Sequence, residues 1–204
     1  MTDNDYQFIT HWRVGGTCSE VADILGDGSS LSRWWPAVYL EVAEIEPPRA
    51  DGLGRRIRAV TKGWLPYTLR WEFVVVESRY PYGLSIEASG DFDGRGVWTF
   101  AQDGPFVDVT YDWRIRAEKP LIRRLSFLLK PLFEANHRWA MAQGEESLKL
   151  ELARRRAFTD AARATIPPAP GPITYAGAAL VVGAVAIGAS LVYLVARSAK
   201  DDAR

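Results

Sequence analysis

Cysteine and histidine are almost missing from this chain. Cys18 is its only cysteine, and His11 and His137 are its only histidines. One thiol forms neither a disulfide framework nor a thiolate metal cluster. Two histidines without cysteine partners make a poor metal site as well. We therefore expect no metal and no cofactor, and we interpret Cys18 as a plain buried thiol.

Net charge is missing too. The 25 basic side chains equal the 25 acidic ones, so the formal charge is zero. A neutral balance gives no electrostatic reason to expect a nucleic-acid partner. The sequence also lacks a glycine-rich phosphate loop, an HExxH motif and a GxSxG motif. The commonest nucleotide-binding and hydrolase signatures are thereby excluded.

Charged side chains are absent from one long segment, residues 173–196, which reads ITYAGAALVVGAVAIGASLVYLVA. As a helix it reaches roughly 36 Å at ~1.5 Å per residue, against a bilayer core of ~30 Å. Tyr175 and Tyr193 lie where interfacial aromatic residues are common. The alternative is a buried core helix, but such helices rarely run this long without a polar face. We predict one transmembrane helix, followed by a short polar tail over 197–204.

The other end of the chain bears on topology. The first ten residues, MTDNDYQFIT, lack the basic start and apolar stretch of a signal peptide. We therefore expect a tail-anchored, single-pass protein of the cell membrane whose N-terminal domain is cytoplasmic. Two small-residue pairs in the span, Ala179 with Gly183 and Ala184 with Gly188, permit close helix approach. They leave self-association of the anchor open.

The N-terminal domain, residues 1–157, begins with one strand and two short helices. Residues 6–14 alternate as a strand does. Residues 17–25 form a predicted helix, in which Thr17 and Glu20 have the spacing of a capping box. Residues 31–35 form a second helix, and the proline that follows stops it.

Six predicted strands follow, separated by clusters of turn residues. They cover residues 38–46, 54–62, 68–78, 83–89, 96–102 and 106–117. Their near-hairpin spacing predicts an antiparallel meander. Apolar residues alternate with charged ones most sharply in two of these strands, 68–78 and 106–117, as Trp71 does with Arg70 and Glu72. The sheet should therefore have one buried and one solvated face.

A long helix over residues 121–156 comes last, and Pro131 within it should kink or restart it. Helical spacing places six residues on one face: Leu125, Leu129, Leu132, Phe133, Asn136 and Ala140. Residues 158–172 form a linker rich in proline and alanine. The fold class is thus α+β, with a curved sheet that grips a long amphipathic helix.

Three segments carry a resemblance to a known superfamily: GTCSEVADIL, SLSRWWPAV and LFEANHRWAMAQGEESLKLEL. With the order of elements, they make residues 6–155 similar to the START-like or SRPBCC superfamily. That superfamily includes the birch-pollen-allergen type and the polyketide cyclase/dehydrase group. The resemblance implies a helix-grip fold, a curved seven-stranded antiparallel sheet around a long C-terminal helix. It also implies an apolar cavity that holds a hydrophobic small molecule.

Candidate ligand-binding residues follow from alternation. Six aromatic residues should point inward: Trp71, Phe73, Trp98, Phe100, Tyr111 and Trp113. The alternative is that these rings simply fill the core. Asn136 lies on the apolar helix face, where its amide needs either a ligand or a protein partner. His137 falls at the edge of that face, and a pair with Glu134 would face away from the cavity.

Three functions fit these observations. The first is a membrane-tethered binding or carrier protein for a hydrophobic small molecule or lipid. The second is an enzyme of the polyketide cyclase or aromatase kind. The third is a non-enzymatic interaction module with a filled core. The sequence favours the first, because the cavity offers few groups for acid–base chemistry beyond Asn136, Tyr111 and His137.

Overall fold

The fold is described here from a computed structural model, in which residues 5–117 and 120–174 are placed. The predicted order of elements is confirmed, with a 3₁₀ turn added between the two short helices. The elements are β1 (Asp5–Gly15), α1 (Cys18–Leu25), η1 (Gly28–Ser30), α2 (Leu31–Trp34), β2 (Tyr39–Glu46), β3 (Arg56–Lys62), β4 (Thr68–Ser78), β5 (Gly83–Gly90), β6 (Phe92–Asp103), β7 (Phe106–Ala117), α3 (Pro120–Arg156) and α4 (Asp160–Ala164).

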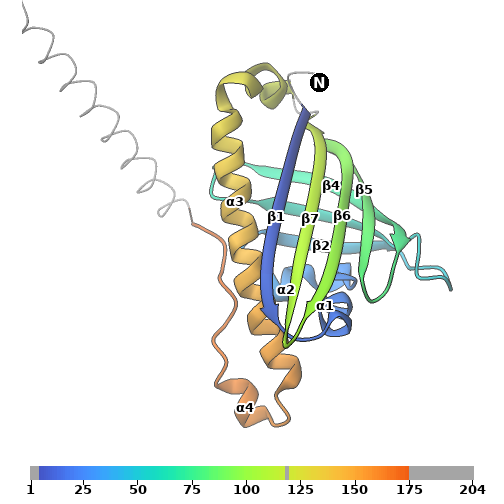
Figure 1. Cartoon of the computed structure of the whole chain (residues 1–204). Coiled ribbons are helices and arrows are strands. Elements are labelled where there is room, and N and C mark those ends of the chain that lie inside the picture. Colours follow the sequence, from blue (N-terminus) through green and yellow to red (C-terminus); the bar gives the residue numbers. More distant parts are fainter. Residues whose placement is uncertain (1–4, 118–119, 175–204) are drawn as a thin grey trace, which may run out of the picture.

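The seven strands form one antiparallel sheet in the order β1-β7-β6-β5-β4-β3-β2. Figure 1 shows the sheet curving strongly around α3, so that β1, β7 and β6 run along the helix while β2 and β4 cross behind it. The predicted helix-grip fold is therefore confirmed. Alternating residues of the strands point to the helix and form the core.

One strand boundary was predicted wrongly. The strand predicted over residues 96–102 was expected to follow a turn at Asp93 and Gly94, but β6 already begins at Phe92 and includes both residues. Gly94 pairs with Ala88 on one side and Ile115 on the other. A Cβ at this position would overlap the Arg114 carbonyl oxygen, so glycine permits the close approach of two strands rather than a turn.

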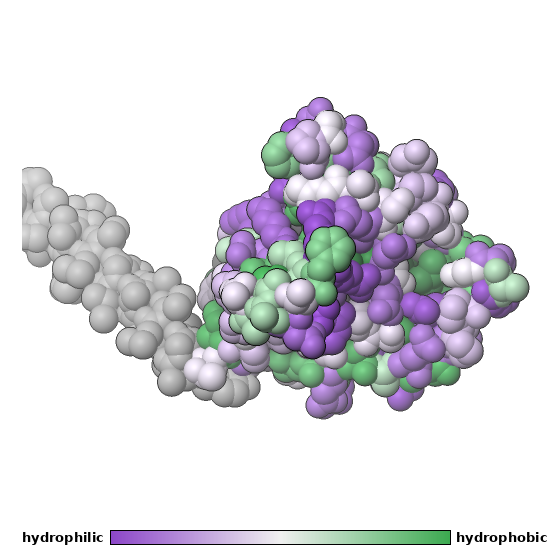
Figure 2. Space-filling view, turned by 90° about the horizontal axis from the view of Figure 1, so that it is seen from below, coloured by the Kyte–Doolittle hydropathy of each residue, from purple (hydrophilic) through white to green (hydrophobic). Residues whose placement is uncertain are grey.

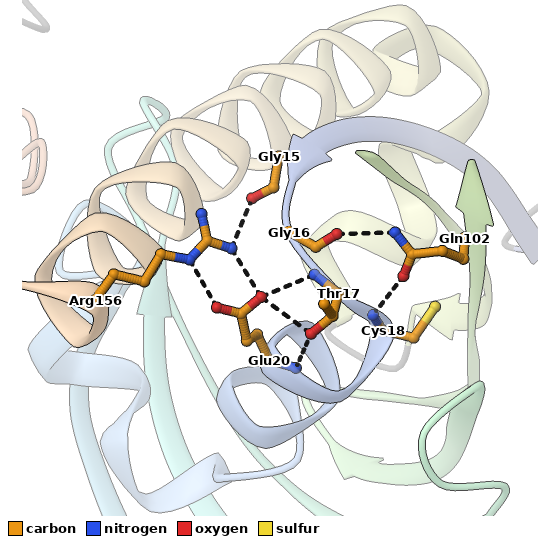
Figure 3. A network of polar contacts seen from close by, with 7 residues as sticks. All are labelled: Gly15, Gly16, Thr17, Cys18, Glu20, Gln102 and Arg156. Carbon is orange, nitrogen blue, oxygen red and sulfur yellow. Dashed lines mark hydrogen bonds and ion pairs between the residues drawn. The ribbon is translucent and has the colours of Figure 1, made fainter. Parts of the chain in front are cut away.

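The C-terminal end of α3 is fastened to α1 by the polar network of Figure 3. The predicted capping box is present: Thr17 Oγ1 accepts from the Glu20 N–H, and Glu20 Oε2 accepts from the Thr17 N–H. Arg156 donates to both carboxylate oxygens of Glu20, at 2.6 and 2.8 Å. Gln102 accepts from the Cys18 N–H and donates to the Gly16 carbonyl, which holds the loop before α1.

A second ion cluster joins α3 to α2. Glu151 is only 2% exposed and accepts two hydrogen bonds from Arg33, at 3.0 and 2.8 Å, and one from Arg155 at 3.0 Å. We call this part of the domain, where α1 and α2 meet residues 148–156 of α3, the closed end. Figure 2 views the molecule from below and shows hydrophilic residues gathered near the centre of that face.

The predicted break at Pro131 takes the form of a bend. α3 is one helix that contains Pro131, and Figure 1 shows its first, yellow part running in a different direction from the rest. Beyond α3 the predicted linker contains α4, and residues 165–174 then run back beside α3, as the orange segment in Figure 1 shows. We call residues 165–174 the strap.

The predicted span 173–196 lies almost wholly outside the described residues, as do the polar tail and the small-residue pairs. Within residues 5–117 and 120–174, no helix combines the length and apolar character that crossing a bilayer requires. The transmembrane anchor therefore stays a prediction from the sequence.

Candidate functional site

A cavity of about 160 Å³ lies between the sheet and α3. Its wall is made by residues of β1, β3, β4, β6, β7 and α3, together with Trp35, Val38 and Tyr39 near the start of β2. An apolar cavity of ~150 Å³ is large enough to take a molecule such as benzene. The predicted internal cavity is therefore present, with room for at least one ring.

Aromatic rings form the sheet side of the wall. Tyr111 and Trp113 alternate inward from β7 and stack with ring centroids 5.6 Å apart, and Trp71 of β4 lies 5.9 Å from Trp113. The Trp71 indole donates to Thr61 Oγ1 at 3.0 Å, which fixes its ring. Phe92 stands edge-on to Trp113. Of the six predicted aromatic residues, Trp71, Tyr111 and Trp113 therefore line the cavity.

The other three predicted aromatic residues lie in the core around this wall and do not line the cavity. Trp98 stacks on Tyr111 at 3.9 Å, and Phe73 packs against Trp71 at 5.2 Å. Phe100 is 2% exposed. Trp98 and Phe73 hold the rings of the wall in place, so any role for these three in ligand binding stays a prediction.

Asn136 lines the cavity and also has a protein partner. Its Oδ1 accepts a hydrogen bond of 3.2 Å from the Leu65 N–H, in the loop between β3 and β4. Gly63 lies against the same amide, where a side chain would collide with it. Asn136 thus ties the β3–β4 loop to α3. Its amide therefore has a structural role and also forms part of the cavity wall.

His137 was predicted at the edge of the apolar face and among the few polar groups of the cavity. It lines the cavity and stacks on Phe8 at 4.2 Å. Leu132, expected inside, is 36% exposed. The inward face is therefore turned slightly from the predicted one and presents Phe133, His137 and Met141 along with Asn136. The i, i+4, i+8 spacing of those three residues was the signal that could have revealed it.

The His137 ring is buried enough to be neutral. Its Nε2 is buried and has no hydrogen-bond partner among the described residues. Burial, and secondarily the charge of Arg138, lowers the pKa of His137 to about 4. At neutral pH this side chain therefore offers the cavity an uncharged ring.

Three tyrosines on the lining, Tyr6, Tyr39 and Tyr67, were not predicted. They join Tyr111 in the wall. Burial raises the pKa of Tyr67 to about 12, and it also raises the pKa values of Tyr39 and Tyr111 above the usual range. Tyr39 lies within the predicted strand 38–46 and could have been found by alternation, whereas Tyr67 lies in a loop and has no periodic signal.

Two charged residues, Lys62 and Asp91, lie on the described lining of the cavity, and both have hydrogen-bond partners. Lys62 Nζ donates to the Ile173 carbonyl at 3.1 Å, and Asp91 Oδ2 accepts from the Arg70 N–H at 2.8 Å. Because the rest of the lining is mainly apolar, a charged ligand would lose much of its hydration here, which is costly. The site therefore fits a neutral apolar molecule with a few hydrogen-bonding groups.

The other candidate sites, a metal site, Cys18 and His11, show no arrangement suited to catalysis or metal binding among the described residues. Within the described residues, no three His, Cys, Asp or Glu side chains come together as a metal site. Cys18 is buried, as predicted, and burial raises the pKa of its thiol. His11 is exposed on the outer face of the sheet, where its Nδ1 is 3.2 Å from Thr110 Oγ1.

Solved structures with the same fold come from several bacteria. The protein TTHA0849 of Thermus thermophilus shares 15% identity at a TM-score of 0.58, over 74% of this chain and 100% of its own. The Zhui aromatase/cyclase of Streptomyces sp. R1128 shares 12% at 0.59, over 76% and 97%. A START superfamily protein of Mycobacterium smegmatis shares 14% at 0.54, over 70% and 98%. At such identities the likeness establishes the fold.

A comparison with curated proteins gave no match. The family described as polyketide cyclase/dehydrase and lipid transport matches residues 13–153. This range includes the end of β1, the whole of β2 to β7 and most of α3. The predicted START-like relationship is thus confirmed, and this chain belongs to the polyketide cyclase/dehydrase and lipid transport family.

Proposed function

We propose that this protein binds or carries a neutral, ring-containing hydrophobic small molecule or lipid, without changing its bonds. The observation that carries the proposal is the cavity walled by Trp71, Tyr111 and Trp113, whose described charged neighbours already have partners. Flat rings offer dispersion contacts and burial to a planar ligand. The lipid-transport part of the family description supports the same interpretation.

An aromatase or cyclase activity is the second candidate, favoured by the fold shared with the Zhui aromatase/cyclase. His137 and Tyr111 both line the cavity and could exchange protons. General acid–base catalysis works best when the pKa lies near the operating pH. Burial moves both pKa values away from neutral pH, because it lowers the pKa of His137 to about 4 and raises that of Tyr111. Binding without bond chemistry is therefore the better fit.

The interaction-module interpretation required a filled core. The open volume beside Trp71 and Trp113 speaks against it. A protein whose role was only to present a surface would gain stability by filling that space. We therefore place the cavity at the centre of the function.

Ligand binding is tested by filling the cavity rather than emptying it. Ala140 lines the cavity, whereas Ala142 is exposed on the same helix. We expect Ala140→Phe to weaken binding of the neutral fluorescent probe N-phenyl-1-naphthylamine at least about ten-fold, since the ring occupies the ligand's space. Ala142→Phe is the matched control and should bind as the native chain does. Equal binding by both variants in fluorescence titrations of the full chain in detergent would refute the proposed site.

The membrane tether is the second part of the proposal. Residues 173–196 anchor the chain in a single pass, and the N-terminal domain faces the cytoplasm. Val185 is central in the span, so Val185→Lys costs about 2.5–3.5 kcal/mol of insertion free energy. We expect the native chain to stay in membranes after alkaline carbonate and the variant to be released more readily. Ser198→Lys, outside the span, is the control, and protease protection of intact cells tests the orientation.

A further inference from the structure

The chain leaves α3 at the end opposite the cavity. Arg156 is the last residue of α3 and belongs to the closed end, whereas Asn136 lines the cavity. The two positions are separated by a helix length of roughly 30 Å at ~1.5 Å per residue. A membrane anchor attached directly to α3 would therefore emerge far from the cavity.

The strap brings the chain back along α3 towards the cavity. It returns beside α3 (Figure 1), and its sequence contains Pro167, Pro168, Pro170 and Pro172. Proline-rich chain favours an extended, semi-rigid conformation that advances about 3.1 Å per residue. The strap, residues 165–174, therefore covers roughly 30 Å, which is the distance back along α3 from the closed end to the cavity.

Both ends of the strap are fastened to the folded domain. Near its start, the Arg154 guanidinium donates to the Pro167 carbonyl. Near its end, Lys62 Nζ donates to the Ile173 carbonyl at 3.1 Å. Lys62 is only 8% exposed and is itself part of the cavity lining. Ile173, the first residue of the predicted membrane span, is therefore bonded to a residue of the ligand site.

We infer that the strap seats the start of the membrane segment beside the cavity, so that the ligand exchanges directly between the cavity and the host bilayer. The inference rests on the proposed function, since it needs both a bound hydrophobic ligand and the anchor. It adds the source of the ligand: a neutral lipid-soluble molecule dissolved in the membrane that holds the protein. A ligand that reached the cavity through water would have to expose its apolar surface on the way.

The experiment separates the anchor from the cavity without altering either. A flexible insertion of about twelve Gly and Ser residues between Thr174 and Tyr175 adds roughly 20 Å of reach. The matched control carries the same insertion in the exposed turn at Asp51 and Gly52, away from the cavity. All chains are full length and reconstituted in phosphatidylcholine vesicles loaded with N-phenyl-1-naphthylamine. Energy transfer from tryptophan to the probe reports loading of the cavity.

We expect the insertion after Thr174 to slow loading from the host bilayer roughly ten-fold, because the effective concentration of cavity at the membrane falls. Its equilibrium affinity for the probe in detergent should stay native, and the control insertion should change neither quantity. Arg154→Met, which releases the start of the strap, should slow loading by a smaller factor. Native loading rates after the Thr174 insertion, with binding intact, would overturn the inference alone. Loss of probe binding by the native chain in detergent would instead overturn the proposed function.

Discussion

Two parts of α3, residues 133–141 at the cavity and residues 148–156 at the closed end, are held by different kinds of contact. At the closed end, Glu151 and Arg156 form ion pairs with α2 and α1, and the Trp34 ring of α2 is fully buried. At the cavity, the Leu65 N–H of the β3–β4 loop donates to the Asn136 amide oxygen of α3, and His137 of α3 stacks on Phe8 of β1. One part of this helix is thus a fixed support, and another part forms a wall of the cavity.

The difference shows where the domain can tolerate empty space. A cavity forfeits dispersion contacts along its wall, which lowers stability. At the closed end, Trp34 and Leu148 are fully buried, and their packing offsets this loss. Binding sites are commonly drawn from the less stable parts of a fold in this way. The predictions below test this contrast, starting with the largest expected effect.

Removing one indole from each end should separate the two regions most clearly. Trp34 is 0% exposed, and its Nε1 has no partner among the described residues, so Trp34→Ala removes packing alone. We expect a loss of about 3–5 kcal/mol in the free energy of unfolding. Trp113→Ala should cost less, since one side of its ring already faces space, and should instead weaken probe binding. Denaturant unfolding of the full chain in detergent measures both.

The contrast fails if the order is reversed. A Trp113→Ala variant that loses more stability than Trp34→Ala, with unchanged probe binding, would mean that the cavity wall is ordinary core. Phe100→Leu serves as a further control, because Phe100 is buried but does not line the cavity. It should lower stability without changing probe affinity.

Acid should weaken the cavity end through His137. Its folded pKa of about 4 lies below the unfolded value near 6.5, so the unfolded chain binds more protons between these pH values. Stability is therefore full above pH 6.5 and falls as the pH drops to about 4, by up to about 3 kcal/mol. His137→Phe keeps the stack on Phe8 and should remove this loss. His11→Gln, on the outer sheet face, should leave it in place in unfolding curves recorded from pH 7 to 4.

The strands were predictable because a period of two has no ambiguity once one face is buried. Trp71, Tyr111 and Trp113 followed from that alternation, whereas the antiparallel order of the sheet followed from the short turns between successive strands. Gly94 misled because glycine marks close backbone approach as well as turns. Close backbone approach can be told from a turn only by knowing which strand lies opposite the glycine, and that depends on tertiary structure.

The helix face was predicted less well for a geometric reason. Adjacent residues are about 100° apart around a helix, so a broad apolar stripe fits more than one rotation. The packing of His137 on Phe8 and of Met141 in the core decides the rotation, and it leaves Leu132 outside. The positions of Tyr67 and of the strap depend on the paths of loops and on hydrogen bonds to backbone carbonyl groups such as that of Ile173. Neither can be predicted from the pattern of side chains along the sequence.

Asn136→Leu tests the tie between α3 and the β3–β4 loop. The variant leaves the Leu65 N–H without its acceptor, which should cost about 1–2 kcal/mol of unfolding free energy. It should also loosen the cavity rim, where Gly63 packs against the amide. Hydrogen exchange of the Leu65 amide is the sharpest measurement. Native protection of that amide in the variant would show that another group, and not Asn136, secures the loop.

The smallest effect should come from the Glu20–Arg156 pair. Arg156, with smaller contributions from the Thr17 N–H and hydroxyl, lowers the pKa of Glu20 to about 2. The folded pKa is below the unfolded value of about 4.5, so this contribution is present above pH 4.5 and is lost as the pH falls towards 2. Both side chains are about two-fifths exposed, and solvent screening limits the stabilisation from this ion pair to about 1 kcal/mol.

Glu20→Gln should lose that amount at pH 7 and show a weaker acid dependence below pH 4.5. Asp160→Asn, which removes an exposed pair with Arg163, should change almost nothing. If Glu20→Gln instead cost as much as Trp34→Ala, the closed end would be held mainly by its ion pairs, and packing would no longer explain how this fold supports an open cavity.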